Sequence, residues 1–178
     1  MLRIILNKFV ILFLFANLSA SPLQTFDEAE IKAAIFQKIL YYINWPPSAF
    51  EQQNNFVIGI AGNDLVSKLL LQNLNNTVIN GYKVIVKPVD NHDNLANYHV
   101  IYLTNLNKNI AKKIAITASY HPVLLVANEM QTYDLNFHII LYTLENKVKF
   151  KVNPDAAKSV NLVISSKIIQ LSRKFEEN

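Results

Sequence analysis

The chain has 178 residues, of which 51% are hydrophobic and 17% are charged. This balance excludes an intrinsically disordered chain, and the length suits one domain that buries a substantial core. The absence of cysteine excludes disulfides, thiol catalysis and thiolate zinc sites, and the net charge of +4 includes no block of basic residues interleaved with aromatics, which argues against a nucleic-acid partner.

Residues 1–20 have the order of a secretory signal peptide. Arg3 and Lys8 precede the apolar run 9–16, and small residues follow at 18–22. A short membrane anchor is the alternative, but a stable transmembrane helix needs roughly 20 apolar residues. We expect residues 21–178 to form a single exported domain. Loss of Arg3 and Lys8 leaves 15 basic and 13 acidic residues, a net charge of +2.

The first expected helix of the mature chain begins near Thr25. Thr25 and Glu28 have the spacing of a capping box. Apolar residues then recur at helical spacing, at Ile31, Ala34, Ile35, Ile39, Tyr42 and Ile43. Trp45-Pro46-Pro47 is expected to end this helix, because proline restricts the residue before it and donates no backbone hydrogen bond.

Strands and helices alternate through the next part of the chain. Four strands are expected, at 56–61, 83–87, 99–103 and 122–127, with helices at 65–74 and 110–118. This alternation predicts an α/β fold with a mainly parallel sheet and helices on both faces. A C-terminal β-hairpin of strands 137–143 and 148–152 is then followed by helices, one beginning at Pro154 and one capped by Ser165.

Several motifs in a fixed order resemble the YfiR/HmsC-like family of periplasmic regulators. They are VKFKVN at 148–153, Ala156-Ala157, NLVISSKIIQLS at 161–172, Ala33-Ala34 with Trp45-Pro46, FVIGIAG at 56–62 and PVLLV at 122–126. The resemblance covers nearly the whole mature chain. Ile168, Ile169 and Ser172 stand where the family usually has Leu, Leu and Ala, and residues 132–137 lack the family's Gly-Gly. Without cysteine, redox control cannot be carried over from relatives.

The resemblance implies a soluble regulator that restrains an inner-membrane diguanylate cyclase through the periplasmic domain of that cyclase. Release of the restraint would raise cyclic di-GMP and favour biofilm. An outer-membrane lipoprotein that antagonises the regulator and a homodimer are further partners to expect by analogy. No cofactor is implied.

Two surfaces are candidates for binding a protein partner. Tyr41 and Trp45 share a face of the expected first helix at i, i+4 spacing, and Phe50 follows them. Packing in the core is the alternative for these aromatic residues. The rim of the last helix carries Lys167, Gln170 and Arg173, for which the alternative is a solvated face.

A glycine-containing turn after the first strand is a candidate small-anion site. Gly59, Gly62 and Asn63 lie between this strand and the following helix, where backbone amides can hold an anion. The sequence lacks the third glycine of the dinucleotide fingerprint and the Gly-Lys-Ser/Thr of a phosphate loop, so an ordinary turn is the alternative. This site motivates a second hypothesis for the function, a periplasmic small-ligand sensor or solute-binding module.

Catalytic and metal sites find little support in the sequence. His92, His99, His121 and His138 lack the spacing of metal ligands, and Ser165-Ser166 lacks the glycines of a nucleophile elbow. We therefore predict no catalytic residue, no metal and no enzyme activity.

Overall fold

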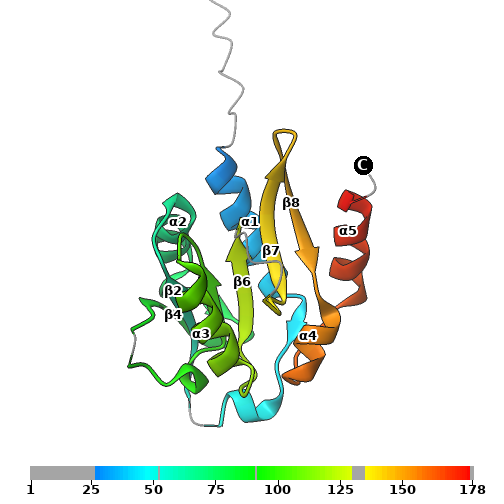
Figure 1. Ribbon diagram of the computed structural model, residues 1–178. Coiled ribbons are helices and arrows are strands. Elements are labelled where there is room, and N and C mark those ends of the chain that lie inside the picture. The colour runs from blue at the N-terminus through cyan, green and yellow to red at the C-terminus, as the bar shows by residue number, and fades with distance from the viewer. Residues whose placement is uncertain (1–26, 52, 91, 130–134, 177–178) are drawn as a thin grey trace, which may run out of the picture.

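The computed structural model describes residues 27–51, 53–90, 92–129 and 135–176, with side chains up to Arg173 (Figure 1). In this part of the chain the main sheet has seven strands in the order β3-β4-β2-β5-β6-β7-β8. The parallel strands are β2 (Asn55–Ala61), β4 (Tyr82–Pro88), β5 (Val100–Leu103), β6 (Leu124–Asn128) and β7 (Ile139–Leu144). β3 (Val78–Ile79) and β8 (Lys147–Val152) are antiparallel edge strands, so the predicted mainly parallel sheet and C-terminal hairpin are confirmed.

Helices cover both faces of the sheet, as predicted. One core contains residues of α1 (Glu28–Leu40), α2 (Leu65–Leu74), α4 (Pro154–Ser159) and α5 (Ser166–Glu176), together with the inward side chains Phe56 and Ile58 of β2. The opposite core contains residues of α3 (Lys108–Ala118) and of the short helix η2 (Leu95–Asn97), together with Val57 and Ala61. Successive β2 residues therefore point to opposite cores, because side chains alternate along a strand.

The strand order places a topological switch between β2 and β5. From β2 the chain continues through α2 to β3 and β4 on one side of β2, and then crosses to β5 on the other side. In sheets of this kind ligands and functional groups gather outside the carboxyl ends of the strands at the switch. The segments after β2, β5 and β6 are therefore the first place to look for a site.

The first helix differs from the prediction at both ends. It begins at Glu28, after Asp27, whose backbone N–H donates to Glu30 Oε2 over 3.3 Å; the predicted cap Thr25 lies outside the described residues. It ends at Leu40 and not at Ile43, because β1 (Ile43–Asn44) pairs antiparallel with β9 (Val163–Ile164). The predicted extension to Ile43 is wrong because a distant strand takes these backbone groups, which periodicity does not reveal.

The last two helices begin where the sequence placed them. Asn153 Oδ1 accepts the N–H of Ala156 over 3.0 Å, with Pro154 at the first helical position. Ser165 Oγ accepts the N–H of Lys167 over 3.4 Å. Both starts use short polar side chains that satisfy otherwise unpaired helical N–H groups, which is a local effect readable from the sequence.

Candidate functional site

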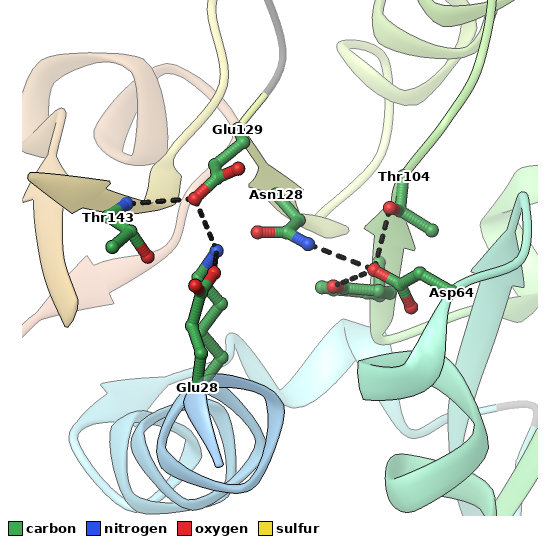
Figure 2. A network of polar contacts seen from close by, with 8 residues as sticks. Glu28, Asp64, Thr104, Asn128, Glu129 and Thr143 are labelled. Atoms are coloured by element: carbon green, nitrogen blue, oxygen red, sulfur yellow. Dashed lines mark hydrogen bonds and ion pairs between the residues drawn. The ribbon is translucent and has the colours of Figure 1, made fainter. Parts of the chain in front are cut away.

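The carboxylate of Asp64 joins the carboxyl ends of three parallel strands (Figure 2). Its Oδ2 accepts hydrogen bonds from the Tyr102 hydroxyl over 2.9 Å, the Thr104 hydroxyl over 2.7 Å and Asn128 Nδ2 over 2.9 Å. Asp64 follows β2, Tyr102 and Thr104 lie at the end of β5, and Asn128 ends β6. The network therefore fixes the strand ends around the topological switch.

Asp64 is also the N-cap of α2. Its Oδ1 accepts the backbone N–H of Ser67 over 2.6 Å, and its own N–H donates to Ser67 Oγ over 2.9 Å. Burial opposes ionisation of the carboxyl, but the hydrogen bonds from Ser67, Thr104, Asn128 and Tyr102 outweigh burial and hold the pKa of Asp64 below its ordinary value. Asp64 is thus an ionised acceptor whose lone pairs are occupied, which makes it a poor base.

A second polar cluster surrounds the buried Lys32 of α1. Its side chain is 2% exposed, and Nζ lies 2.7 Å from Glu28 Oε1 and 2.6 Å from Glu129 Oε1. The same oxygen of Glu129 accepts the backbone N–H of Thr143 over 2.9 Å. The hydrogen bond from Lys32 is the main cause that lowers the pKa of Glu28. The cluster ties α1 to the segment after β6 and to β7, and Figure 2 shows Asn128 between it and Asp64.

The two glycines of the predicted small-anion site have packing roles. A Cβ at Gly62 would lie 1.7 Å from the carbonyl oxygen of Thr104, and Gly62 has φ +102°. A Cβ at Gly59 would lie 2.7 Å from the Tyr98 ring. The carbonyl of Asn63 accepts a hydrogen bond from Asn105 Nδ2 over 2.9 Å. These contacts explain the residues without a ligand, and anion binding stays a prediction.

Gly62 and Asn63 nevertheless line a hollow of about 170 Å³ together with Lys68 and Lys87. Lys68 contributes an ammonium group that favours an anion, whereas the Lys87 ammonium lies over the Tyr98 ring, 4.7 Å from its centroid. Against this, the Asp64 carboxylate already accepts the Ser67 N–H at the start of α2. An anionic ligand would therefore have to use Lys68 instead of that amide.

Trp45 and Phe50 lie half-buried over the amino end of the sheet. Trp45 Nε1 donates to the carbonyl of His99 over 3.1 Å, and its ring meets Phe56 edge-on with the ring centroids 5.0 Å apart. Phe50 stacks on Tyr82 with the ring centroids 4.3 Å apart. Because α1 ends at Leu40, the predicted helix face shared by Tyr41 and Trp45 does not exist.

Tyr41 itself is 52% exposed, and tertiary pairing brings it close to the last helix. The β1–β9 pair continues into a hydrogen bond from the N–H of Ser165 to the carbonyl of Tyr42 over 2.9 Å. Lys167, Gln170 and Arg173 are exposed on α5, whereas Ile168 is buried. The residue after Tyr41 is thus bonded to the cap of α5, and Tyr41, Lys167, Gln170 and Arg173 are together called the β1–α5 surface below. Partner binding there stays a prediction.

Two buried histidines accept backbone hydrogen bonds just before the first residues of β5 and β7. Nδ1 of His99 accepts the N–H of Val57 over 3.1 Å, and Nδ1 of His138 accepts the N–H of Leu125 over 2.9 Å. Burial lowers the pKa of each imidazole to about 4. Among the described residues no three His, Asp or Glu side chains gather in a way that could hold a metal ion.

Comparison with known families shows to which protein family the chain belongs. Residues 29–173 match the model of the YfiR/HmsC-like family. The chain belongs to the YfiR/HmsC-like family. This is a family of periplasmic regulators of diguanylate cyclases, and its members are not known enzymes. No curated protein matches the sequence.

The family match extends from α1 into α5, so it includes the Asp64 network, Lys32 with Glu129, and the β1–α5 surface, whereas Glu28 lies one residue before it. None of the helices in the described ranges has the length and apolar character needed to cross a membrane. Sequence reasoning missed the roles of Lys32, Glu129, Tyr102 and Asn128. The sole local signal was Asn63-Asp64 after a buried strand, which predicts a turn and a helix cap but not the bonds to β5 and β6.

Proposed function

We propose that this protein is a periplasmic regulator that binds the periplasmic domain of an inner-membrane diguanylate cyclase and restrains the cyclase, which lowers cyclic di-GMP and biofilm formation. The match of residues 29–173 to the YfiR/HmsC-like family carries the proposal. Export by a signal peptide at residues 1–20 and a single mature domain at 21–178 are part of it.

The proposed mechanism is a shift of the receptor's population. A regulator that binds the inactive state more tightly than the active state stabilises the inactive state by the difference in binding free energy. A nearly complete switch needs about 5.5 kcal/mol of such difference, which a protein interface can supply without a reactive group. The polar side chains at the carboxyl ends of the strands are consistent with a function without a reactive group, because Asp64 and Lys32 are engaged with other residues of the chain.

The β1–α5 surface is our proposed contact with the receptor. Tyr41 offers an exposed aromatic side chain, the kind of residue that often anchors an interface. Lys167 and Arg173 add positive charge around it, which favours an acidic patch on the receptor. A homodimer would present this surface twice to a dimeric cyclase, and an outer-membrane lipoprotein that covers it would release the cyclase.

Deletion of the gene tests the function directly. Cyclic di-GMP is expected to rise in a strain that produces the partner cyclase, and the rise should disappear when that cyclase is also inactivated. Unchanged cyclic di-GMP in the single deletion would refute the proposal.

Complementation then tests the surface. Tyr41→Ala should fail to restore low cyclic di-GMP, whereas Tyr120→Ala, at a residue that is 79% exposed outside the β1–α5 surface, should restore it fully. Equal levels of the two variants in the periplasm must be confirmed by immunoblot. Full restoration by both variants would show that the receptor binds elsewhere.

A small-ligand sensor is the second candidate, and the hollow beside Gly62, Asn63, Lys68 and Lys87 favours it. Thermal-shift screening with anions, nucleotides and amino acids tests it. A specific upward shift that Lys68→Ala removes would support ligand sensing at this hollow, and the absence of any shift would count against it.

A further inference from the structure

A hollow of about 260 Å³ lies between α3 and α4 on the β6–β7 side of the sheet. Leu125 and His138 line it from the sheet. The helical walls and the approach to β7 contribute polar and apolar side chains, which include Lys112, Ile116, Ser119, Asn136, Ser159 and Val160. In Figure 1 α3 and α4 flank the lower parts of β6 and β7. The volume corresponds to roughly nine water molecules at about 30 Å³ each, enough for a small organic molecule.

The hydrogen-bonding state of His138 follows from its surroundings. Its Nδ1 accepts the N–H of Leu125 over 2.9 Å, so the hydrogen of the neutral imidazole is on Nε2. The residue is 4% exposed, and within the described part of the chain no protein group accepts a hydrogen bond from Nε2; this atom is not closed off from solvent, because His138 lines the hollow. An N–H donor that faces the hollow is free to donate to an acceptor bound there.

His99, which has the corresponding role in the other strand pair, differs from His138 in what surrounds Nε2. His99 makes the same bond through Nδ1, to the N–H of Val57. Its ring, however, is covered by Phe50 and Phe56, whose centroids lie 4.6 and 4.9 Å from that of His99, and its Nε2 is sealed from solvent. At His138 the corresponding space is the hollow.

The charge and polarity of the lining select the ligand. Lys112 supplies a cation, and the described lining residues include no carboxylate. The hydroxyls of Ser119 and Ser159 already donate to carbonyls of their own helices, over 2.7 Å in each case, so the donors left in the described lining are Lys112, His138 and the amide of Asn136, of which Lys112 alone is a cation. Ile116, Leu125, Leu135 and Val160 provide apolar surface beside them.

We propose that the α3–α4 hollow binds a small organic carboxylate with a compact apolar body. The carboxylate accepts hydrogen bonds from Lys112 Nζ and from Nε2 of His138, and the apolar body packs on Leu125, Leu135 and Val160. The proposal does not rest on the function proposed above, because it concerns a ligand and not the receptor.

Titration of the ¹⁵N-labelled protein with benzoate, followed by NMR, tests the site. Benzoate should produce saturable shifts at the amides of Leu125, Ser119 and Val160. Benzamide has the same shape without the charge and should bind about tenfold more weakly, because a charge-assisted hydrogen bond is lost. Absence of saturable shifts at these amides would overturn the proposal.

Two adjacent lysines of α3 provide a matched control. Lys112 lines the hollow and Lys113 does not. Lys112→Ala should weaken benzoate binding about tenfold, and Lys113→Ala should leave it unchanged. Equal weakening by both substitutions would show a general attraction of anions to α3. If both variants bound benzoate as tightly as the wild type, Lys112 would not bind the carboxylate. Either result overturns the proposal.

The variant His138→Asn tests the second donor. Asparagine can keep an acceptor for the Leu125 N–H while removing Nε2. Benzoate affinity should fall about tenfold in this variant, with the amide spectrum otherwise preserved. If the variant does not fold, the comparison of Lys112→Ala with Lys113→Ala still tests whether the hollow binds the carboxylate.

Discussion

His99 and His138 make the same pair of hydrogen bonds at two places in the parallel sheet. His99 donates its backbone N–H to the carbonyl of Val57 over 2.9 Å and accepts the N–H of Val57 through Nδ1 over 3.1 Å. His138 does the same with Leu125, over 3.2 and 2.9 Å. Each imidazole thus takes the place of a backbone carbonyl just before β5 or β7. A ring in this role has to remain neutral, because protonation of Nδ1 removes the acceptor.

This arrangement predicts a loss of stability in mild acid. Burial lowers the pKa of both histidines from 6.5 to about 4, so the unfolded chain binds more protons between these values. The free energy of unfolding should be highest above about pH 6.5 and fall as the pH drops to about 4, by about 3 kcal/mol for each histidine. Urea unfolding across this range measures the effect.

The carboxylates with lowered pKa values are Glu28, Asp64 and Asp93. Their effects on stability fall below their ordinary pKa values of 4.5, 3.8 and 3.8, so the window above about 4.5 belongs to the histidines. His138→Asn should remove about half of the pH dependence in that window. A free energy of unfolding that is constant between about pH 6.5 and 4.5 would contradict the neutral, buried state of the rings.

The buried ion pairs of Lys32 predict that substitutions of Lys32, Glu28 and Glu129 have strongly coupled effects on the free energy of unfolding. The double variant Glu28→Gln/Glu129→Gln leaves an ammonium that is 2% exposed without a counter-charge, and the expected loss is about 3 kcal/mol. Addition of Lys32→Met, which has a similar volume without the charge, should restore most of that loss. Chemical denaturation measures all three, and a triple variant no more stable than the double would contradict the account.

Asp64 is predicted to be a structural residue. Asp64→Asn replaces an ionised acceptor of four hydrogen bonds with a neutral amide that cannot accept all of them, and we expect a loss of about 3 kcal/mol. Asp155→Asn, in the exposed first turn of α4, should cost less than about 1 kcal/mol. Equal effects of the two substitutions on the unfolding midpoint would argue against the network.

Gly62 and Gly81 allow steric and conformational effects to be separated. Both have positive φ, +102° and +85°, but a Cβ at Gly62 meets the carbonyl of Thr104, whereas a Cβ at Gly81 meets nothing within 4 Å. Gly81→Ala should cost about 1 kcal/mol of backbone strain. Gly62→Ala should cost at least about 2 kcal/mol more, because it forces β2 and β5 apart at their ends. Thermal unfolding compares the two, and similar losses would contradict the close approach.

Much of the fold could be predicted from local pattern. The apolar run of β2 and the start of α5 after Ser165 are set by neighbouring residues, since burial of a strand and capping of a helix depend on side chains a few positions apart. The alternation of strands and helices then fixed the parallel sheet with helices on both faces, because parallel strands need crossover connections.

The polar clusters, and the pairing that brings Tyr41 near the start of α5, came from tertiary structure alone. Lys32 and Glu129 are 97 positions apart, and Asp64 and Asn128 are 64 apart. Ile43 pairs with Ile164, which ends α1 early and places Tyr41 beside α5. Periodicity and capping depend on residues within one element, whereas these contacts depend on which strand ends meet in space. The order of strands in the sheet decides that, and no stretch of the sequence encodes it locally.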